Sequence, residues 1–369
     1  MLIVSMRGVW IVALPLVVVL GAFLLPDAPA PSPIQSDERV VLFETTAVID
    51  RRAPLCIVPI HGWIHEPVSS VVRMKAIEET LEAYTDVEIP ANDRARFERR
   101  IGLFLVDNEH GKELTVEVGG QGGRLLPASL PNGHFRGSVE LAAGKADANS
   151  VDGILSVETI AADARVFRGR LRLVEREGIS VISDIDDTVK VSEVGNKKRL
   201  LARTFWEEFE AVPGMPELFG KWREQGVVFH YVSSSPWQLY EPLVEWLDRA
   251  KLPHASLHLK VVRLKDSSIL DLIAPGSETK PPMLAEVLAT FPERTFILVG
   301  DSGEADPEVY APLLRAHPEQ VVRVAIRNVT GARRDDARFA RLFEGIAAER
   351  WVLFDDPKEL EGFLPNSSR

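Results

Sequence analysis

The chain has 369 residues, of which 46% are hydrophobic and 26% are charged, so it is long enough for two globular domains and unlike a disordered or fibrous protein. Its formal net charge of -11 argues against binding driven by contacts to nucleic-acid phosphates, so we expect no nucleic acid among its partners. The single cysteine, Cys56, excludes an internal disulfide and a zinc site built from several cysteines.

The amino terminus carries a candidate membrane segment. Arg7 precedes an uncharged apolar run over 8–25 that is just long enough to span a bilayer, and a proline-rich stretch follows it. We expect residues 1–33 to be a transmembrane or signal anchor with its tether. Because the positive charge precedes the run, the remainder should face the non-cytoplasmic side, in the cell envelope or periplasm. Cleavage at Ala28-Pro29-Ala30 would make the protein secreted instead.

Short strands separated by turn residues dominate 34–175, which predicts a β-sandwich-like accessory domain. Strands are expected at 55–63, 102–106, 114–118 and 135–141, hairpin connections at 108–111 and 119–123, and helices at 69–83 and 91–100. His61, Trp63 and His65 alternate along one of these strands, a pattern that more often reflects packing than a metal site. We therefore assign no chemistry to this region.

Strands alternate with helices over 176–362, which predicts an α/β domain with a parallel sheet. Strands are expected at 179–182, 227–232, 257–264, 295–299, 321–326 and 351–354, and helices at 198–210, 214–224, 238–251 and 282–291. The connection over 189–212 is short, so only a small cap can lie above the first strand.

Three of these buried strands end in runs of oxygen-bearing side chains. The runs are Asp184-Ile185-Asp186-Asp187-Thr188, Ser233-Ser234-Ser235 and Gly300-Asp301-Ser302-Gly303-Glu304-Ala305-Asp306. The carboxyl ends of parallel strands meet at one edge of a sheet, where ligands of open α/β folds bind. Carboxylates gathered there suit magnesium. Each run alone also fits an ordinary turn or helix cap.

Together these runs resemble the haloacid dehalogenase (HAD) superfamily of phosphotransferases. Its four motifs match Asp184-x-Asp186-x-Thr188, Ser233, Lys280 and Gly300-Asp301-x-x-x-x-Asp306. The longer stretches 183–190, 229–240 and 299–310 are similar to the catalytic domain of the actin-patch phosphatidate phosphatase family. This resemblance implies a HAD-like Rossmannoid sheet over about 177–356. The apolar amino terminus departs from the fungal members, which are cytosolic.

The resemblance also implies roles for individual residues. Asp184 would be the nucleophile that forms an aspartyl-phosphate, and Asp186 the general acid and base. The implied residues are Asp184, Asp186 and Lys280 for catalysis, Thr188, Ser233 and Ser234 for substrate binding, and Asp184, Asp186, Asp301 and Asp306 for Mg2+. Asp186 would bind the metal through its main-chain carbonyl, and Asp306 would ligate it or orient Lys280. Lys260 and Lys265 remain alternatives for the cation.

The resulting hypothesis is a magnesium-dependent phosphatase of lipid metabolism that converts phosphatidate to diacylglycerol and phosphate. A small cap leaves the site open, which suits a bulky or membrane-resident substrate. One alternative keeps the mechanism but acts on a phosphoprotein, a nucleotide or another phosphomonoester. The other is a non-catalytic envelope protein that binds phosphates or partners. No protein partner and no oligomeric state follow from the sequence.

Overall fold

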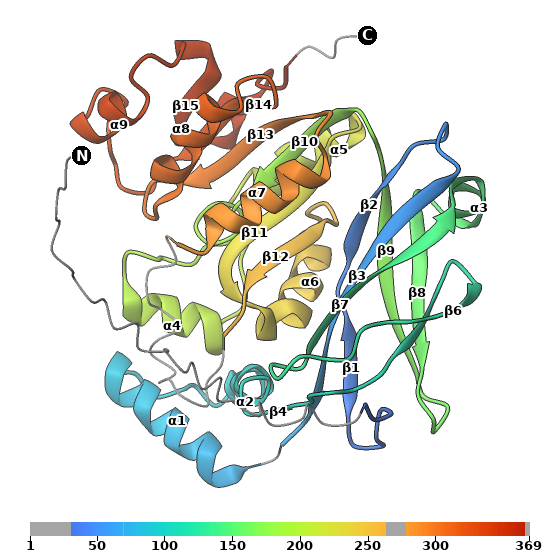
Figure 1. Ribbon diagram of the computed structural model, residues 1–369. Coiled ribbons are helices and arrows are strands. Elements are labelled where there is room, and N and C mark those ends of the chain that lie inside the picture. The colour runs from blue at the N-terminus through green and yellow to red at the C-terminus, as the bar shows by residue number, and fades with distance from the viewer. Residues whose placement is uncertain (1–30, 69, 263–277, 366–369) are drawn as a thin grey trace, which may run out of the picture.

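The computed structural model describes residues 31–68, 70–262 and 278–365 (Figure 1). They form two sheets in the first half of the chain and a six-stranded parallel sheet in the second half. The predicted membrane segment falls on residues outside this description. Among the described helices, none is both long and apolar enough to cross a membrane. The anchor therefore stays a prediction.

The first half consists of two sheets packed face to face, with β7 and β3 running beside β2 and β9 in Figure 1. One sheet contains β1 (Arg39–Leu42), β3 (Leu55–Glu66), β4 (Asp107–Asn108) and β7 (His134–Ala142). The other contains β2 (Thr45–Ile49), β9 (Val166–Glu175), β8 (Ile154–Ile160), β5 (Thr115–Val118) and β6 (Gln121–Leu125). Val58 and Val139 of the first sheet share a core with Val116 and Leu155 of the second. This is the sandwich arrangement that alternating strands favour.

One strand prediction in this half is wrong. Residues 102–106 follow directly on helix α2 (Arg94–Gly102), and no strand forms there. Phe97, Ile101 and Phe104 are buried at helical spacing, so the apolar run extends the buried side of α2. The loop at 108–111 is not a hairpin, because β4 pairs with β3, whereas 119–123 does join the antiparallel strands β5 and β6. The helix expected at 69–83 is confirmed as α1 (Val71–Thr85), and α3 (Ala143–Asn149) was not predicted.

The parallel sheet has the strand order β12-β11-β10-β13-β14-β15 and confirms the predicted α/β class. Its strands are β10 (Gly178–Ser183), β11 (Val228–Pro236), β12 (Ser256–Lys260), β13 (Arg294–Asp301), β14 (Val321–Arg327) and β15 (Trp351–Phe354). The chain first runs outward from β10 to β12 and then returns to place β13 on the other side of β10. Strand order thus reverses between β10 and β13, and in such sheets ligands bind at this point.

Helices cover both faces of this sheet. Successive residues of β10, which point to opposite faces, are therefore both buried. Val181 packs with α4 (Lys197–Phe205), α5 (Met215–Glu224) and α6 (Tyr240–Arg249), whereas Ile182 packs with α7 (Lys280–Thr290) and α8 (Asp306–Ala316). The remaining pieces are α9 (Ala337–Leu342) and short 3-10 turns at Trp237–Leu239, Ala348–Arg350 and Pro357–Leu360. Proline near the first position of α5, α7 and α8 favours helix initiation there.

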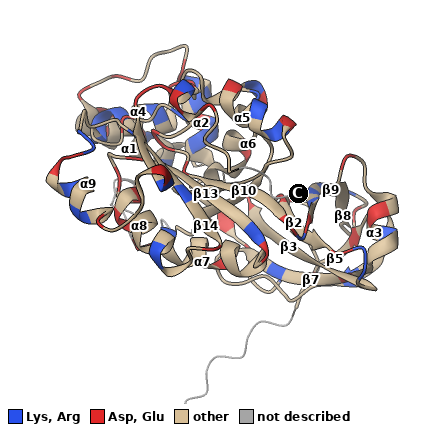
Figure 2. Cartoon of the chain, turned by 90° about the horizontal axis from the view of Figure 1, so that it is seen from above, with Lys and Arg blue, Asp and Glu red and all other residues tan. Residues whose placement is uncertain are grey.

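The two halves of the molecule share one hydrophobic core. Phe43 of the sandwich stacks on Trp237 with ring centroids 4.2 Å apart, and the Glu44 N–H donates to the Tyr240 hydroxyl at 2.6 Å. Buried Arg100 of α2 donates to the carbonyl oxygen of Thr204, at the end of α4, at 2.8 Å. In the view of Figure 2, acidic and basic residues are interleaved around α4, α2 and α6. The first half of the chain thus packs against α4 and against the residues that follow β11, both of which lie near the predicted site.

Candidate active site

Asp184 is the first residue after β10 and is completely buried. Its N–H donates to the carbonyl of Val299 on β13 at 2.9 Å, which places it at the point where strand order reverses. Its Oδ2 accepts a hydrogen bond from the Thr188 hydroxyl at 3.1 Å, and its Oδ1 lies 2.9 Å from Nζ of Lys280. Burial raises the pKa of Asp184 well above its usual value, and Lys280 opposes that shift.

Lys280 begins α7 and is buried among three carboxylates from two segments, the one that follows β10 and the one that follows β13. Its Nζ lies 2.9 Å from Asp184, 2.8 Å from Glu304 and 2.6 Å from Asp306. Burial alone would lower the pKa of this amine, but the three carboxylates outweigh it and raise the pKa well above normal. Asp306 is held here because Gly300 leaves room for it. A Cβ at position 300 would lie 2.3 Å from Oδ2 of Asp306.

Two of these carboxylates, together with Asp301, also form a group that could bind a metal ion. Ligand oxygens of Asp184, Asp301 and Glu304 all lie within 4.8 Å of one another. Oδ1 of Asp301 accepts the N–H groups of Gly303 and Glu304, while its buried Oδ2 has no hydrogen-bond partner among the described residues. Burial, then neighbouring carboxylates such as Asp306, raises the pKa of Asp301. An unpaired buried carboxylate oxygen beside two other acidic ligands fits a divalent cation.

Asp186 points into a different polar cluster. Its Oδ1 lies 2.7 Å from Nζ of buried Lys190 and accepts from Ser192 at 2.6 Å. Its Oδ2 accepts from the hydroxyls of Ser233 at 3.2 Å and Ser235 at 2.8 Å. Burial works to raise the pKa of Asp186, but Lys190 and these hydrogen bonds outweigh it and lower the pKa to about 2. At this pKa the side chain is ionised near neutral pH, which suits the base half of its predicted role but not the acid half.

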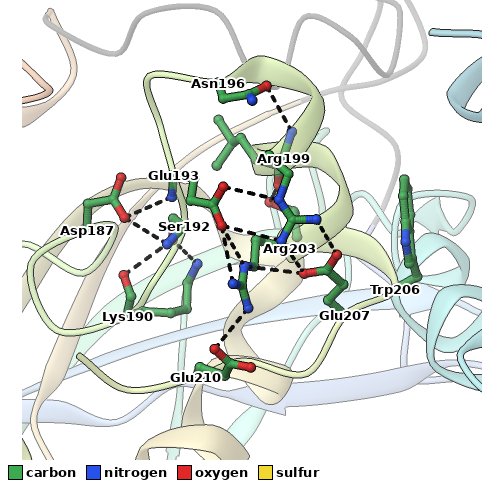
Figure 3. A network of polar contacts seen from close by, with 12 residues as sticks. Asp187, Lys190, Ser192, Glu193, Asn196, Arg199, Arg203, Trp206, Glu207 and Glu210 are labelled. Atoms are coloured by element: carbon green, nitrogen blue, oxygen red, sulfur yellow. Dashed lines mark hydrogen bonds and ion pairs between the residues drawn. The ribbon is translucent and has the colours of Figure 1, made fainter. Parts of the chain in front are cut away.

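The third carboxylate of the run, Asp187, fixes the loop that leads to α4 (Figure 3). Its backbone is left-handed, with φ 52°, and its carboxylate accepts the N–H groups of Ser192, Glu193 and Val194 at 2.7–2.8 Å. Glu193 then accepts from two arginines of α4, Arg199 and Arg203. The predicted small cap is thus a single short helix held by charged side chains.

The structure brings together most of the residues that the motifs indicated. Asp184, Thr188, Lys280, Asp301 and Asp306 lie in one connected cluster, with Asp186 and Ser233 in the adjoining one. The side chain of Asp186 is bound by Lys190 and three serines and is not one of the grouped metal ligands, so its main-chain carbonyl stays the predicted ligand. The Ser234 hydroxyl has no hydrogen-bond partner among the described residues. Lys260 lies on β12, and Lys265 falls outside the described residues.

Sequence reasoning missed three participants: Glu304, Lys190 and Ser235. Glu304 and Ser235 lie inside the oxygen-rich runs and Lys190 ends the stretch 183–190, so the sequence showed their positions but not their contacts. Glu304 could have been suspected from its place between Asp301 and Asp306, because acidic residues in one loop can converge on a cation. Asp186 accepts hydrogen bonds from Ser233 and Ser235. The backbone conformation at the end of β11 selects these two serines, and residue types alone do not determine that conformation.

Comparison with known proteins finds relatives that match less than half of the chain. Relatives include an uncharacterized protein of Schizosaccharomyces pombe, 29% identical over 45% of this chain and 27% of that protein. Phosphatidate phosphatase APP1 of Saccharomyces cerevisiae is 32% identical over 41% of this chain and 26% of that protein. The chain therefore spans about a quarter of the length of these relatives. A solved class C acid phosphatase of Bacillus anthracis has a TM-score of 0.27 over 52% of this chain and 74% of that one, too low to support an inference.

A protein family matches part of the second half of the chain. Residues 179–328 match the family described as "Phosphatidate phosphatase APP1, catalytic domain", which is a family of phosphoric monoester hydrolases. The matched segment runs from β10 to the end of β14 and contains every residue of the acidic cluster around Lys280. The resemblance of this segment to the actin-patch phosphatidate phosphatase catalytic domain, predicted from the motifs, is thereby confirmed.

Proposed function

We propose that this chain is a phosphoric monoester hydrolase that works through an aspartyl-phosphate on Asp184, with phosphatidate as the leading substrate. The observation that carries the proposal is the buried Asp184 carboxylate, which contacts the Lys280 amine and is grouped with the carboxylates of Asp301 and Glu304. The family match of residues 179–328 supports the same class of reaction.

The chain's own residues suit a two-step displacement. Thr188 and Lys280 hold the two oxygens of Asp184 in place, so that one of them can attack phosphorus as the bond from phosphorus to the ester oxygen breaks. The departing alkoxide takes its proton from water, because Asp186 is ionised near neutral pH. Lys280 also balances charge on the phosphoryl group. Asp186, ionised and fixed by four neighbours, is suited to take a proton from the water that hydrolyses the aspartyl-phosphate.

We further propose that Mg2+ is bound by Asp184, Asp301 and Glu304. A bound Mg2+ supplies positive charge that stabilises the phosphoryl oxygens in the transition state. Four carboxylates (Asp184, Asp301, Glu304 and Asp306) surround one lysine here, so a divalent cation would offset an excess of negative charge. The domain limits 34–175 and 176–362, and the membrane location through residues 1–33, remain part of this proposal.

Phosphate release tests the proposal. The full-length protein in detergent micelles is assayed with phosphatidate and with water-soluble phosphomonoesters, including a nucleotide and a phosphopeptide, with and without Mg2+. We expect Mg2+-dependent release from phosphatidate that is lost in Asp184→Asn and retained in Asp163→Asn, whose exposed carboxylate pairs with Arg165 far from the site in sequence. Release only from soluble esters would keep the mechanism and discard the lipid substrate. No release from any ester would refute the enzyme.

A further inference from the structure

A large apolar cleft lies between the sandwich and the parallel sheet. Its volume is about 720 Å³, and its walls are β2 and β3 on one side and β12 and α7 on the other. Three large hydrophobic side chains on its lining are strongly exposed: Leu55 at 52%, Ile57 at 63% and Val261 at 49%. Ligand sites typically measure about 300–1,000 Å³ and are mainly apolar, so the cleft has the size and lining of a binding site.

The cleft and the candidate active site share helix α7. Lys280, the first residue of α7, contacts Asp184, whereas Met283, one turn later, lines the cleft. The lining continues along α7 through Val287 to Phe291, just past the helix end. At a rise of 1.5 Å per residue, the stretch from Met283 to Phe291 is about 12 Å long. The cleft thus extends away from the acidic cluster along α7.

Strands β11 and β12 make the same connection. Ser235 on β11 donates to Asp186, and Trp237, two residues later, lines the cleft. Val261 follows the last residue of β12, and β11 and β12 are parallel, so it lies at the sheet edge that carries the site. The cleft and the candidate active site are therefore built from residues two or three positions apart on the same segments.

The charged groups that line the cleft have partners, so its interior carries little free charge. Arg136 of β7 and Glu286 of α7 form an ion pair of 3.5 Å between the two walls. Burial keeps the pKa of His258 at about 4, so this histidine is neutral at pH 7. The remaining acidic groups also pair with arginines: Glu44 with Arg170 and Arg172, and Asp50 with Arg176.

We propose that this cleft binds the hydrocarbon chain of a lipid phosphate whose phosphate group lies at Asp184 and Lys280. The inference rests on the proposed function and assigns the part of the substrate that the phosphatase site does not hold. An amphiphilic ester fits both the active site and the cleft. Its anionic head would contact Lys280, and its hydrocarbon chain would cover the apolar lining. A nucleotide or sugar phosphate would leave Leu55, Ile57 and Val261 exposed to water.

Binding of alkyl phosphonates, which cannot be hydrolysed, tests this inference without any turnover. Methyl-, hexyl- and decylphosphonate are titrated into the full-length protein by calorimetry with Mg2+ present, below the concentration at which they form micelles. We expect affinity to rise with chain length by roughly three- to fourfold per buried methylene, until the cleft is full. In Ile57→Glu, the gain with chain length should disappear while methylphosphonate binds as before.

Ile160→Glu is the matched control, because Ile160 is similarly exposed at 59% and is not part of the cleft lining. Affinity that does not depend on chain length, or an Ile57→Glu variant that behaves like Ile160→Glu, would overturn the inference. If no ester is hydrolysed but binding still depends on chain length and on Ile57, the phosphatase proposal fails and the hydrocarbon site stands. If soluble esters are hydrolysed and chain length has no effect on binding, the phosphatase proposal stands and the hydrocarbon site fails.

Discussion

Lys280 is the residue on which the electrostatics of the site depend most directly. It is 3% exposed, and its amine contacts the carboxylates of Asp184, Glu304 and Asp306. Burying a lysine and three carboxylates costs free energy that only their mutual attraction offsets. Removing the amine would leave the three carboxylates facing one another without a counterion, which is the costly way to break a buried ion pair.

Lys280→Met should therefore lower the free energy of unfolding by about 3–5 kcal/mol. Urea denaturation measures this, with Lys221→Met as the control because Lys221 is exposed and pairs only with exposed Glu361. Added Mg2+ should restore part of the loss if a cation binds the same carboxylates. Equal stability of the two variants would show that the carboxylates around Lys280 do not need its charge.

Glu304 allows a separate test of the proposed metal group. Glu304→Gln removes the negative charge of one of the three grouped ligands, so Mg2+ affinity should fall by about tenfold or more. The increase in melting temperature with Mg2+ concentration measures the affinity. The control is Glu308→Gln, which removes a carboxylate that pairs with Arg338 outside the group. If both variants respond to Mg2+ like the unchanged protein, Glu304 is not a ligand.

At the scale of elements, the turn after β10 sets the position of the cap. Asp187 adopts a positive φ of 52° and accepts three N–H groups from residues 192–194. Asp tolerates this conformation better than most residues, and a carboxylate can bind several N–H groups at once. The link from β10 to α4 is thus fixed by one side chain, and the arginine–glutamate network of Figure 3 then holds α4 over the loop.

Asp187→Ala should cost about 2 kcal/mol or more, because one buried and two partly buried N–H groups lose their acceptor. Hydrogen exchange should show faster exchange at Ser192, Glu193 and Val194, and urea denaturation should give the stability loss. Asp187→Asn keeps one acceptor oxygen and tolerates the left-handed backbone, so its loss should be smaller. Unchanged exchange at these three amides in Asp187→Ala would contradict the proposed role of the turn.

The sequence predicts the strands of the parallel sheet better than it predicts the loops that carry the site. Buried runs such as 179–182 and 295–299 predict strands β10 and β13, and parallel pairing then brings Asp184 and Asp301 to one edge. Loop conformation is not encoded in periodicity, so the turn of Glu304 toward Lys280 and the pairing of Lys190 with Asp186 could not be predicted. The strand expected at 102–106 failed because a short apolar run also fits the end of a helix.

On the scale of the whole molecule, the sandwich and the parallel sheet are joined by a buried layer of aromatic rings. Phe43 stacks on Trp237, and His61 packs edge-on against the same indole with ring centroids 4.7 Å apart. Burial lowers the pKa of His65 and His134, which pack against Trp63 and Trp237 in this layer, to about 4. These histidines are neutral in the folded protein near neutral pH, and charging them would require the buried layer to open.

This layer predicts that the protein loses stability in mild acid. Between about pH 6.5 and 4 the unfolded chain binds protons at these histidines and the folded protein does not, so the free energy of unfolding falls as the pH falls. The loss should be on the order of a few kcal/mol between pH 7 and 4.5. Urea midpoints across this range measure it. His65→Phe should flatten the dependence and exposed His317→Phe should not, whereas midpoints independent of pH would contradict the prediction.

The most direct test of the account is to trap the phosphoryl group on the protein. The Asp186→Asn variant is mixed with 32P-labelled phosphatidate and Mg2+, quenched with acid and digested, and the labelled peptide is sequenced. We predict a hydroxylamine-sensitive label on the peptide that contains Asp184, and no label when Asp184→Asn is added to the variant. Full turnover of the unmodified protein with no label in either variant, or a label on a peptide that lacks Asp184, would contradict the account.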